Sequence, residues 1–226
     1  MKADLLAAEE RIKALIAPLQ HGQFSVELGK VLVYVQSVTR DLDSTHAALR
    51  AMEEKRAKDS DAARDEQERR NAAIKQAYRK KVRDTLSFAR RNLDSARLLA
   101  LERVVHKPRL ASKADLEKRA LALQKSFDRM DGPASAMLEH YTSTSDPLNK
   151  YLVAGPWGHE YLQKRRIDPE EYDLALCRLL GCQDTLVGRV VMSYTPICRA
   201  MDELEAVAQE MGFDDFVRAN FAVLSP

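Results

Sequence analysis

Few side chains in this sequence have the types and spacings that catalysis or metal binding requires. The five histidines stand at positions 21, 46, 106, 140 and 159, and no two have the helical spacing that lets imidazoles share a metal ion. Adjacent acids such as Glu53 and Glu54 point in different directions on a helix. Glycine-rich phosphate loops, GxSxG and HExxH are missing. We therefore expect no catalytic, cofactor-binding or metal-binding residues, and no enzyme.

The three cysteines, Cys177, Cys182 and Cys198, are odd in number and have apolar neighbours. This pattern predicts free, buried thiols in a reducing compartment. The first residues mix charges with apolar side chains, unlike a secretory leader. No stretch approaches the roughly 20 uncharged apolar residues of a membrane span. We expect a soluble, intracellular (cytoplasmic) protein.

Charge is distributed unevenly along the chain. The net charge is only +2, but residues 71–110 hold 11 Lys or Arg against 3 Asp or Glu. On a helix, several of these cations fall within about 40° of one another and others flank them. We call the set the basic stripe: Lys75, Arg79, Lys80, Arg83, Arg90, Arg91 and Arg97.

The basic stripe has two interpretations. It could bind a polyanion, either nucleic acid or an anionic membrane, through Coulomb attraction and counterion release. Alternatively, it could pair with acids of the same chain, on a preceding helical arm or in the C-terminal region. Candidate acids in those two places are Asp41, Asp43, Glu53, Glu54, Asp202, Glu203, Glu205, Glu210, Asp214 and Asp215.

A second candidate site lies in the segment 152–166. It contains the only tryptophan, Trp157, together with His159, Tyr161 and Arg165. Trp, Tyr and Arg are enriched at interface hot spots, and loops often carry function. The alternative is that Trp157 fills a junction between helices.

The segments that must position these residues show the apolar spacing of α-helices. Good helix formers abound and aromatic residues make up only 6% of the chain. Residues 3–17 predict a first helix, which Pro18 ends. Apolar residues then alternate at spacings of three and four from Leu28 to Met52, a heptad seam that requires a partner helix.

The segment 53–73 has no apolar residue larger than alanine, although no Gly or Pro interrupts the chain between Gly29 and Pro108. A helix there would have nothing to bury. Either the chain reverses near residues 58–61 and forms an antiparallel hairpin, or one helix of about 80 residues requires a dimer. We favour the hairpin, whose second arm regains an apolar face from Ile74.

Shorter helices are expected after Pro108. We predict helices over about 112–131 and 134–142, a Pro/Gly-rich loop at 143–168, and a helix that begins at Asp168-Pro169. A last seam runs from Leu186 to Met211, with a kink or a new start at Pro196. The predicted fold is all-α: an elongated antiparallel helical hairpin or coiled coil (1–110) plus a smaller C-terminal helical bundle (111–226).

These patterns favour a non-enzymatic scaffold, adaptor or assembly protein. Its expected partners are other proteins, including a second copy of itself, bound by coiled-coil packing or by the Trp157 segment. The alternative is a helical module that binds an anionic membrane or nucleic acid through residues 75–97. No cofactor and no small-molecule substrate is inferred.

Overall fold

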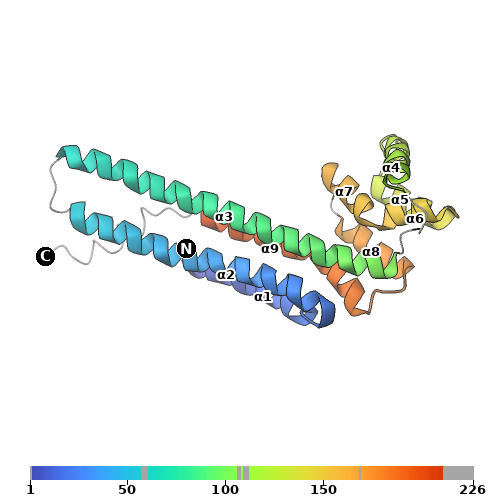
Figure 1. The fold of residues 1–226 in the computed structure, drawn as a ribbon, viewed down its shortest axis with the longest axis horizontal. Coiled ribbons are helices and arrows are strands. Elements are labelled where there is room, and N and C mark those ends of the chain that lie inside the picture. The colour runs from blue at the N-terminus through green and yellow to red at the C-terminus, as the bar shows by residue number, and fades with distance from the viewer. Residues whose placement is uncertain (1, 57–60, 106–107, 109–111, 168, 211–226) are drawn as a thin grey trace. The chain divides into compact units, whose positions relative to one another are not determined.

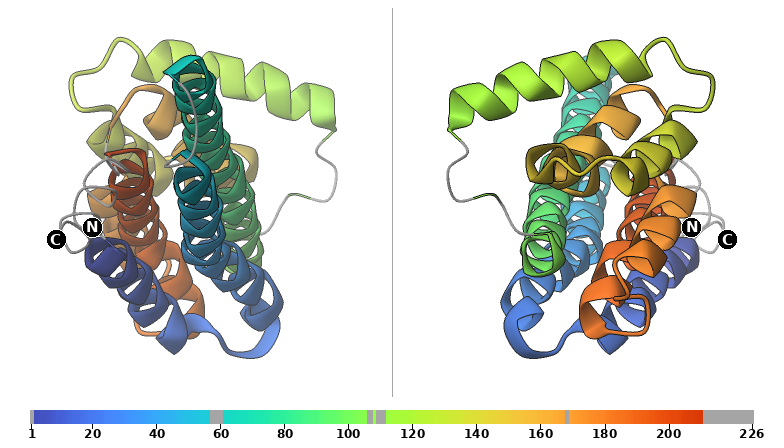
Figure 2. Two further views of the ribbon diagram at one scale, coloured as in Figure 1. Left: turned by 90° about the vertical axis from the view of Figure 1, so that its left-hand side faces the viewer. Right: turned by 90° about the vertical axis from the view of Figure 1, so that its right-hand side faces the viewer.

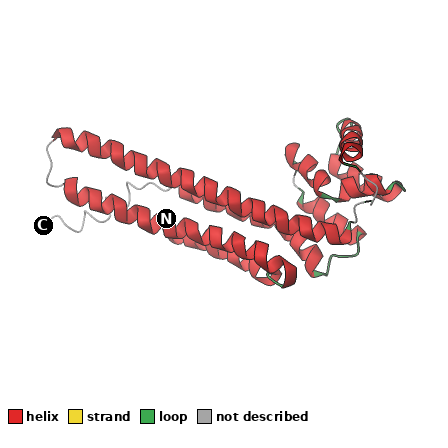
Figure 3. Ribbon diagram, viewed as in Figure 1, coloured by secondary structure: helices red, strands yellow, loops and turns green. Residues whose placement is uncertain are grey.

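The described part of the chain is all-α, which confirms the predicted fold class (Figure 3). The computed structural model describes residues 2–56, 61–105, 108, 112–167 and 169–210. Two short 3₁₀ turns, Ala17–Leu19 and Gly22–Phe24, connect the first two helices. The helices are α1 (Lys2–Ile16), α2 (Ser25–Arg56), α3 (Asp61–Val104), α4 (Lys113–Phe127), α5 (Pro133–Ser143), α6 (Pro147–Ala154), α7 (Pro156–Lys164), α8 (Glu170–Leu179) and α9 (Leu186–Glu210).

The chain divides into two compact units that are interleaved along the sequence. The first contains residues 1–17, 29–91 and 199–226, and the second contains residues 18–28 and 92–198. These bounds differ from the two consecutive domains, 1–110 and 111–226, that we predicted from the sequence. The predicted domains stay a prediction.

Within the first unit, α2 and α3 lie side by side and antiparallel (Figure 1). Near one end, the Tyr34 and Phe88 rings stack with centroids 5.8 Å apart. Further along α2 and earlier along α3, Lys81 Nζ lies 2.7 Å from Asp41 Oδ1. This pairing of the two arms excludes one uninterrupted helix. The predicted reversal at 58–61 falls largely outside the described residues.

The first unit is a bundle rather than a bare hairpin, because α1 and α9 cover the α2–α3 pair. On α1, Glu9 is buried, accepts a hydrogen bond from the Thr39 hydroxyl of α2, and pairs with Lys13 at 2.6 Å. On α9, Gln209 Nε2 donates to the carbonyl oxygen of Arg79 in α3 (3.1 Å). Figure 2 shows α1, α2, α3 and α9 nearly along their axes. The extent of any elongated arm stays a prediction.

The predicted seams are the core of this bundle. Most of their members in the first unit are buried: Val31, Val35, Val38, Leu42 and Leu49 on α2, Tyr78, Val82, Leu86 and Ala89 on α3, and Met201, Leu204 and Ala208 on α9. Thr45, Met52 and Ile74 are half-buried, and Ala77 is exposed. The heptad seam therefore finds its partner helices inside the same chain. It is not available for a coiled coil with another chain.

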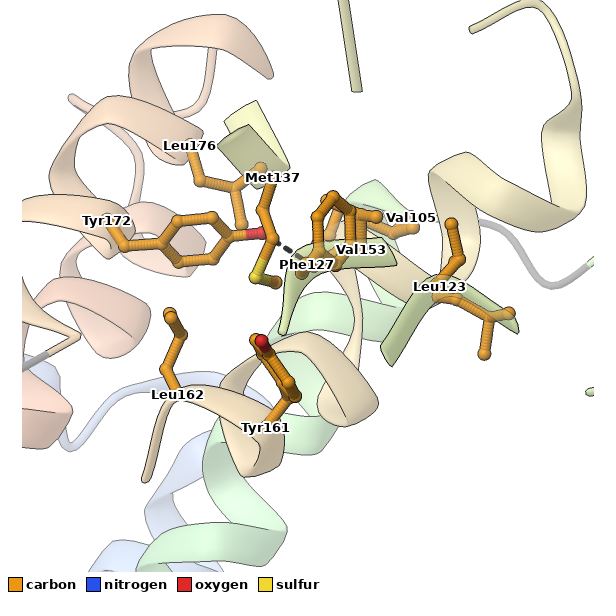
Figure 4. Close-up of a cluster of buried hydrophobic side chains, with 11 residues drawn as sticks. Val105, Leu123, Phe127, Met137, Val153, Tyr161, Leu162, Tyr172 and Leu176 are labelled. Carbon is orange, nitrogen blue, oxygen red and sulfur yellow. Dashed lines mark hydrogen bonds between the residues drawn. The ribbon is translucent and has the colours of Figure 1, made fainter. Parts of the chain in front are cut away.

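The second unit contains α4 to α8, packed around one apolar cluster (Figure 4). Phe127 of α4, Met137 of α5 and Leu162 of α7 are buried together there. The Tyr172 hydroxyl of α8 donates to the carbonyl oxygen of Val153 in α6 (2.6 Å), which satisfies both polar atoms inside the core. Helix α4 begins as expected, because Ser112 and Asp115 form a capping box.

The predicted loop at 143–168 is wrong, because the structure forms α6 and α7 there. Pro147 and Pro156 occupy the first turns of these helices, where a missing N–H costs nothing and the fixed φ suits a helix. Asp146 caps α6 by accepting from the Leu148 N–H (2.9 Å). These prolines start helices rather than interrupt them.

Helix α9 runs through Pro196, so the predicted new start is excluded, whereas the alternative, a kink, stays a prediction. Gly158 allows α6 and α7 to approach closely, because a Cβ at this position would clash with the carbonyl oxygen of Val153. None of the described helices combines the length and apolar character needed to cross a membrane.

Candidate functional site

The structure separates the members of the basic stripe. Arg90 is neutralised inside the first unit, where its Nη2 lies 2.6 Å from Asp202 Oδ1 and 3.1 Å from Glu205 Oε2 of α9. Arg97 belongs to the second unit and is buried. Two members of the predicted polyanion site are therefore engaged within the chain. The C-terminal acids, and not those on the preceding arm, are the partners of Arg90.

Three other cations of the stripe face solvent in the first unit. Arg79, Lys80 and Arg83 are exposed on α3 and line an open groove of about 500 Å³ beside Gln209. Arg83 Nε lies 3.8 Å from Glu205, a long and exposed ion pair. Polyanion binding by this part of the stripe stays a prediction. Lys75 is half-buried, and Arg91 lies over the Phe88 ring at 5.4 Å.

The Trp157 segment lies mostly in the core of the second unit. Trp157 is half-buried and packs on the apolar cluster, and its ring stacks on Tyr161 with centroids 5.5 Å apart. Tyr161 and His159 are buried. Arg165 is exposed and pairs with Asp128 at 2.6 Å. This packing follows our alternative interpretation, in which Trp157 fills a junction between helices.

Arg97 of the basic stripe and His159 of the Trp157 segment lie together at a buried polar centre in the second unit. Arg97 Nη2 donates to Asp173 Oδ1 over 2.7 Å, and the two side chains are only 7% and 0% exposed. His159 Nε2 lies 3.4 Å from the other oxygen, Asp173 Oδ2, without the geometry of a hydrogen bond. Helices α3, α7 and α8 thus bring Arg97, His159 and Asp173 together.

Tyr194 of α9 covers this polar centre. Its ring lies 5.0 Å from the Arg97 guanidinium carbon, and the His159 ring meets it edge-on with centroids 4.9 Å apart. The Tyr194 hydroxyl donates to Asp94 and accepts from Gln163 Nε2 (3.3 Å). Burial and the neighbouring charges raise the pKa of Tyr194, so it stays a neutral donor.

A cavity of about 300 Å³ adjoins the centre, lined by Arg97, His159 and Tyr194 among others. Three buried atoms of the centre have no hydrogen-bond partner: Arg97 Nε, His159 Nε2 and Asp173 Oδ2. Unsatisfied buried polar atoms are costly and therefore uncommon in proteins.

No protein-family model, curated protein or solved structure matches this chain. Its function must therefore be inferred from its own residues.

Asp173 is not among the residues predicted from the sequence, although a signal for it is present there. Asp173 follows the buried Tyr172 and precedes the buried Leu176 and Cys177 by three and four residues. A carboxylate on the apolar face of an amphipathic helix needs a buried partner. That reasoning could have marked Asp173, but its partners Arg97 and His159 are distant in sequence.

The cysteines agree with the sequence prediction where the structure tests it. All three are free, Cys177 and Cys182 are buried, and Cys198 is half-buried. Burial raises the pKa of the Cys177 thiol, which disfavours a reactive thiolate. Within the ranges that the structure describes, no three metal-binding side chains gather into a cluster.

An exposed aromatic ring on α3 was not predicted. Phe88 is 47% exposed, stacks on Tyr34 of α2 and lies under Arg91. We call Tyr34, Phe88 and Arg91 the Phe88 face. All three residues belong to the first unit.

Acid should destabilise the protein through His159. Burial is the largest influence on its pKa and lowers it; Asp173 acts in the opposite direction, and Arg97 lowers it further. The unfolded chain, with a histidine pKa of about 6.5, therefore takes up a proton before the folded chain does. The contribution of His159 to stability is complete above about pH 6.5 and is lost as the pH falls below it, by at most about 1.4 kcal/mol per pH unit.

Urea unfolding at about pH 7.5 and about pH 5.5 measures this effect. The His159→Gln variant should lose less stability than the wild type between the two pH values. An equal loss would show that His159 does not titrate differently in the two states.

Proposed function

We propose that this protein is a non-enzymatic assembly protein that binds other proteins, a second copy of itself included, through the Phe88 face. The exposure of Phe88, whose ring stacks on Tyr34 and lies under Arg91, is the observation that supports this proposal. Aromatic and Arg side chains are enriched at interfaces, where they contribute much of the binding energy.

The burial of the heptad seam supports the choice of this outer face. Since the seam packs on helices of the same chain, an intermolecular coiled coil would require the bundle to open. The Phe88 face needs no such rearrangement. Two copies related by a twofold axis would each contribute the same surface, so Phe88 of one copy can pack near Tyr34 of the other.

Sedimentation velocity over a concentration series, up to about 100 μM, tests the proposal. The wild type should shift from monomer to dimer as concentration rises. Phe88→Asp should weaken self-association by about tenfold or more, because the loss of an aromatic hot spot costs about 2 kcal/mol and every 1.4 kcal/mol is tenfold.

Leu121→Asp is the matched control. Leu121 is 54% exposed on α4, in the second unit, so its replacement adds the same charge away from the Phe88 face. This control should self-associate as the wild type does. A wild type that remains monomeric throughout, or equal weakening by both substitutions, would rule out self-association through the Phe88 face.

The second candidate function is polyanion binding by the exposed part of the basic stripe. Its support is the groove lined by Arg79, Lys80 and Arg83, three cations that face solvent on consecutive turns of α3. Lys and Arg side chains in such an array bind phosphates or sulfates and release their counterions.

Charge reversal of Arg79, Lys80 and Arg83 to Glu should abolish binding to duplex DNA or heparin, measured by fluorescence anisotropy. Wild-type affinity should fall steeply with salt. The control reverses Lys118, Lys125 and Arg129, three exposed cations of the second unit, for the same change in net charge. If both triple variants bind alike, a specific role for the groove is wrong.

A further inference from the structure

Helix α8 ends in a turn that brings two cysteines together. Gly181 has a φ of 64°, the left-handed conformation with which many helices end. The Cys182 N–H donates to the carbonyl oxygen of Cys177 (3.0 Å), and the Gly181 N–H donates to that of Arg178 (3.1 Å). These two bonds make a Schellman motif, in which the side chains at the positions of Cys177 and Cys182 frequently contact each other.

The backbone hydrogen bond also limits how far apart the two cysteines can be. A carbonyl oxygen lies about 2.4 Å from its own Cα, and an amide nitrogen lies about 1.5 Å from its own. With the bond of 3.0 Å between them, the Cα atoms of Cys177 and Cys182 are less than about 7 Å apart. Disulfides usually join Cα atoms that are about 4.4–6.8 Å apart. A bond between these two sulfurs therefore requires no large movement of the backbone.

The structure describes this pair as two neutral thiols. Both cysteines are free and buried, and Cys177 Sγ lies 3.8 Å from the carbonyl oxygen of Gly188. Burial is the main cause of the raised pKa of Cys177, and the neighbouring Cys182 thiol raises it further, since two adjacent thiolates would repel each other. All three residues belong to the second unit.

We propose that Cys177 and Cys182 form an intramolecular disulfide when the protein meets a disulfide oxidant such as glutathione disulfide. One cysteine sulfur attacks a sulfur of the oxidant and releases one glutathione thiol. The other cysteine then attacks the mixed disulfide and releases the second glutathione thiol. Two electrons and two protons pass from the cysteines to glutathione, and the new bond ties the end of α8 to the turn before α9.

Burial affects the rate of this reaction and not its equilibrium. Neutral, buried thiols react only when the end of α8 opens locally. Once the bond has formed, the folded chain already holds the two sulfurs together, whereas the unfolded chain loses entropy to bring them together. The disulfide should therefore be favoured more strongly in the folded chain than in the unfolded chain.

Equilibration of the full chain with mixtures of reduced and oxidised glutathione, followed by thiol blocking and mass spectrometry, tests this inference. Trypsin places each of the three cysteines in its own peptide, 167–178, 179–189 and 190–199. A bond between Cys177 and Cys182 joins the first two peptides. In the same glutathione mixture, the ratio of disulfide to dithiol should be about tenfold or more higher in the folded chain than in the chain unfolded in urea. An equal or lower ratio in the folded chain would overturn the proposal.

The third cysteine supplies the matched control. Cys198 lies on α9, outside the Schellman motif, and is half-buried. Cys198→Ser should form the same linked peptides as the wild type, and Cys182→Ser should form no intramolecular disulfide. A bond between Cys177 and Cys198 in Cys182→Ser, or loss of the linked peptides in Cys198→Ser, would show that the turn after α8 does not select the pair. The inference does not depend on self-association through the Phe88 face.

Discussion

Replacing Asp173 with alanine is expected to lower the free energy of unfolding by about 3–5 kcal/mol. The substitution leaves the Arg97 guanidinium, only 7% exposed, without its carboxylate partner 2.7 Å away. A buried charge without a counterion has lost its hydration and gains nothing in return. Urea or guanidinium unfolding, followed by circular dichroism at 222 nm because the fold is all-α, measures the loss.

Glu160→Ala is the matched control for the buried pair. Glu160 and Lys164 also lie 2.7 Å apart, but on the surface of α7, where they are 60% and 74% exposed. An exposed i,i+4 pair contributes about 0.3–0.5 kcal/mol. Equal small losses in Asp173→Ala and Glu160→Ala would show that Arg97 and Asp173 are not a buried ion pair.

Phe127→Ala should cost about 3–5 kcal/mol of unfolding free energy. Phe127 is 1% exposed in the apolar cluster of the second unit, with its ring edge-on to His140 (5.7 Å) and tilted against Tyr161 (6.1 Å). Its removal loses buried apolar area and leaves a cavity between α4 and its neighbours. Thermal and denaturant unfolding measure the change.

Leu121→Ala on the same helix separates packing from helix propensity. Leu121 is exposed, so its truncation should change stability by no more than about 0.5 kcal/mol. Comparable losses in Phe127→Ala and Leu121→Ala would contradict the packing of α4 on the cluster.

Periodicity predicted the elements whose apolar faces are long and regular. Val35, Val38 and Leu42 fall on one face of α2 at spacings of three and four, and all are buried. The same pattern marked Val82 and Leu86 on α3. A helix with an apolar stripe over several turns must bury that stripe. The presence of the helix and the face that it buries therefore follow from the sequence.

The short helices α6 and α7 could not be recognised from the spacing of their apolar residues. Eight or nine residues span about two turns, too few for a pattern to emerge from noise. Their starts depend on Pro147 and Pro156, and a proline begins or ends a helix according to the residues that follow it. Packing on the apolar cluster decides that each of these prolines begins a helix.

The buried centre could not be predicted because its members are distant along the chain. Arg97 looked like one more cation on a basic face, and 76 residues separate it from Asp173. A single sequence identifies ionisable residues on apolar faces, but not which of them meet. Arg90 is similar, since its partners on α9 are 112 and 115 residues away. The fold converts part of a continuous basic stripe into internal ion pairs.

Site-specific photo-crosslinking from position 88 tests assembly through the Phe88 face most directly. A benzophenone amino acid in place of Phe88 should give a covalent dimer on irradiation, with the crosslink mapped by mass spectrometry to α2 or α3 of the second copy, near Tyr34 or position 88. The same probe in place of Leu121 should give no dimer. Absence of a covalent dimer from position 88, or equal crosslinking from position 121, would contradict assembly through this face.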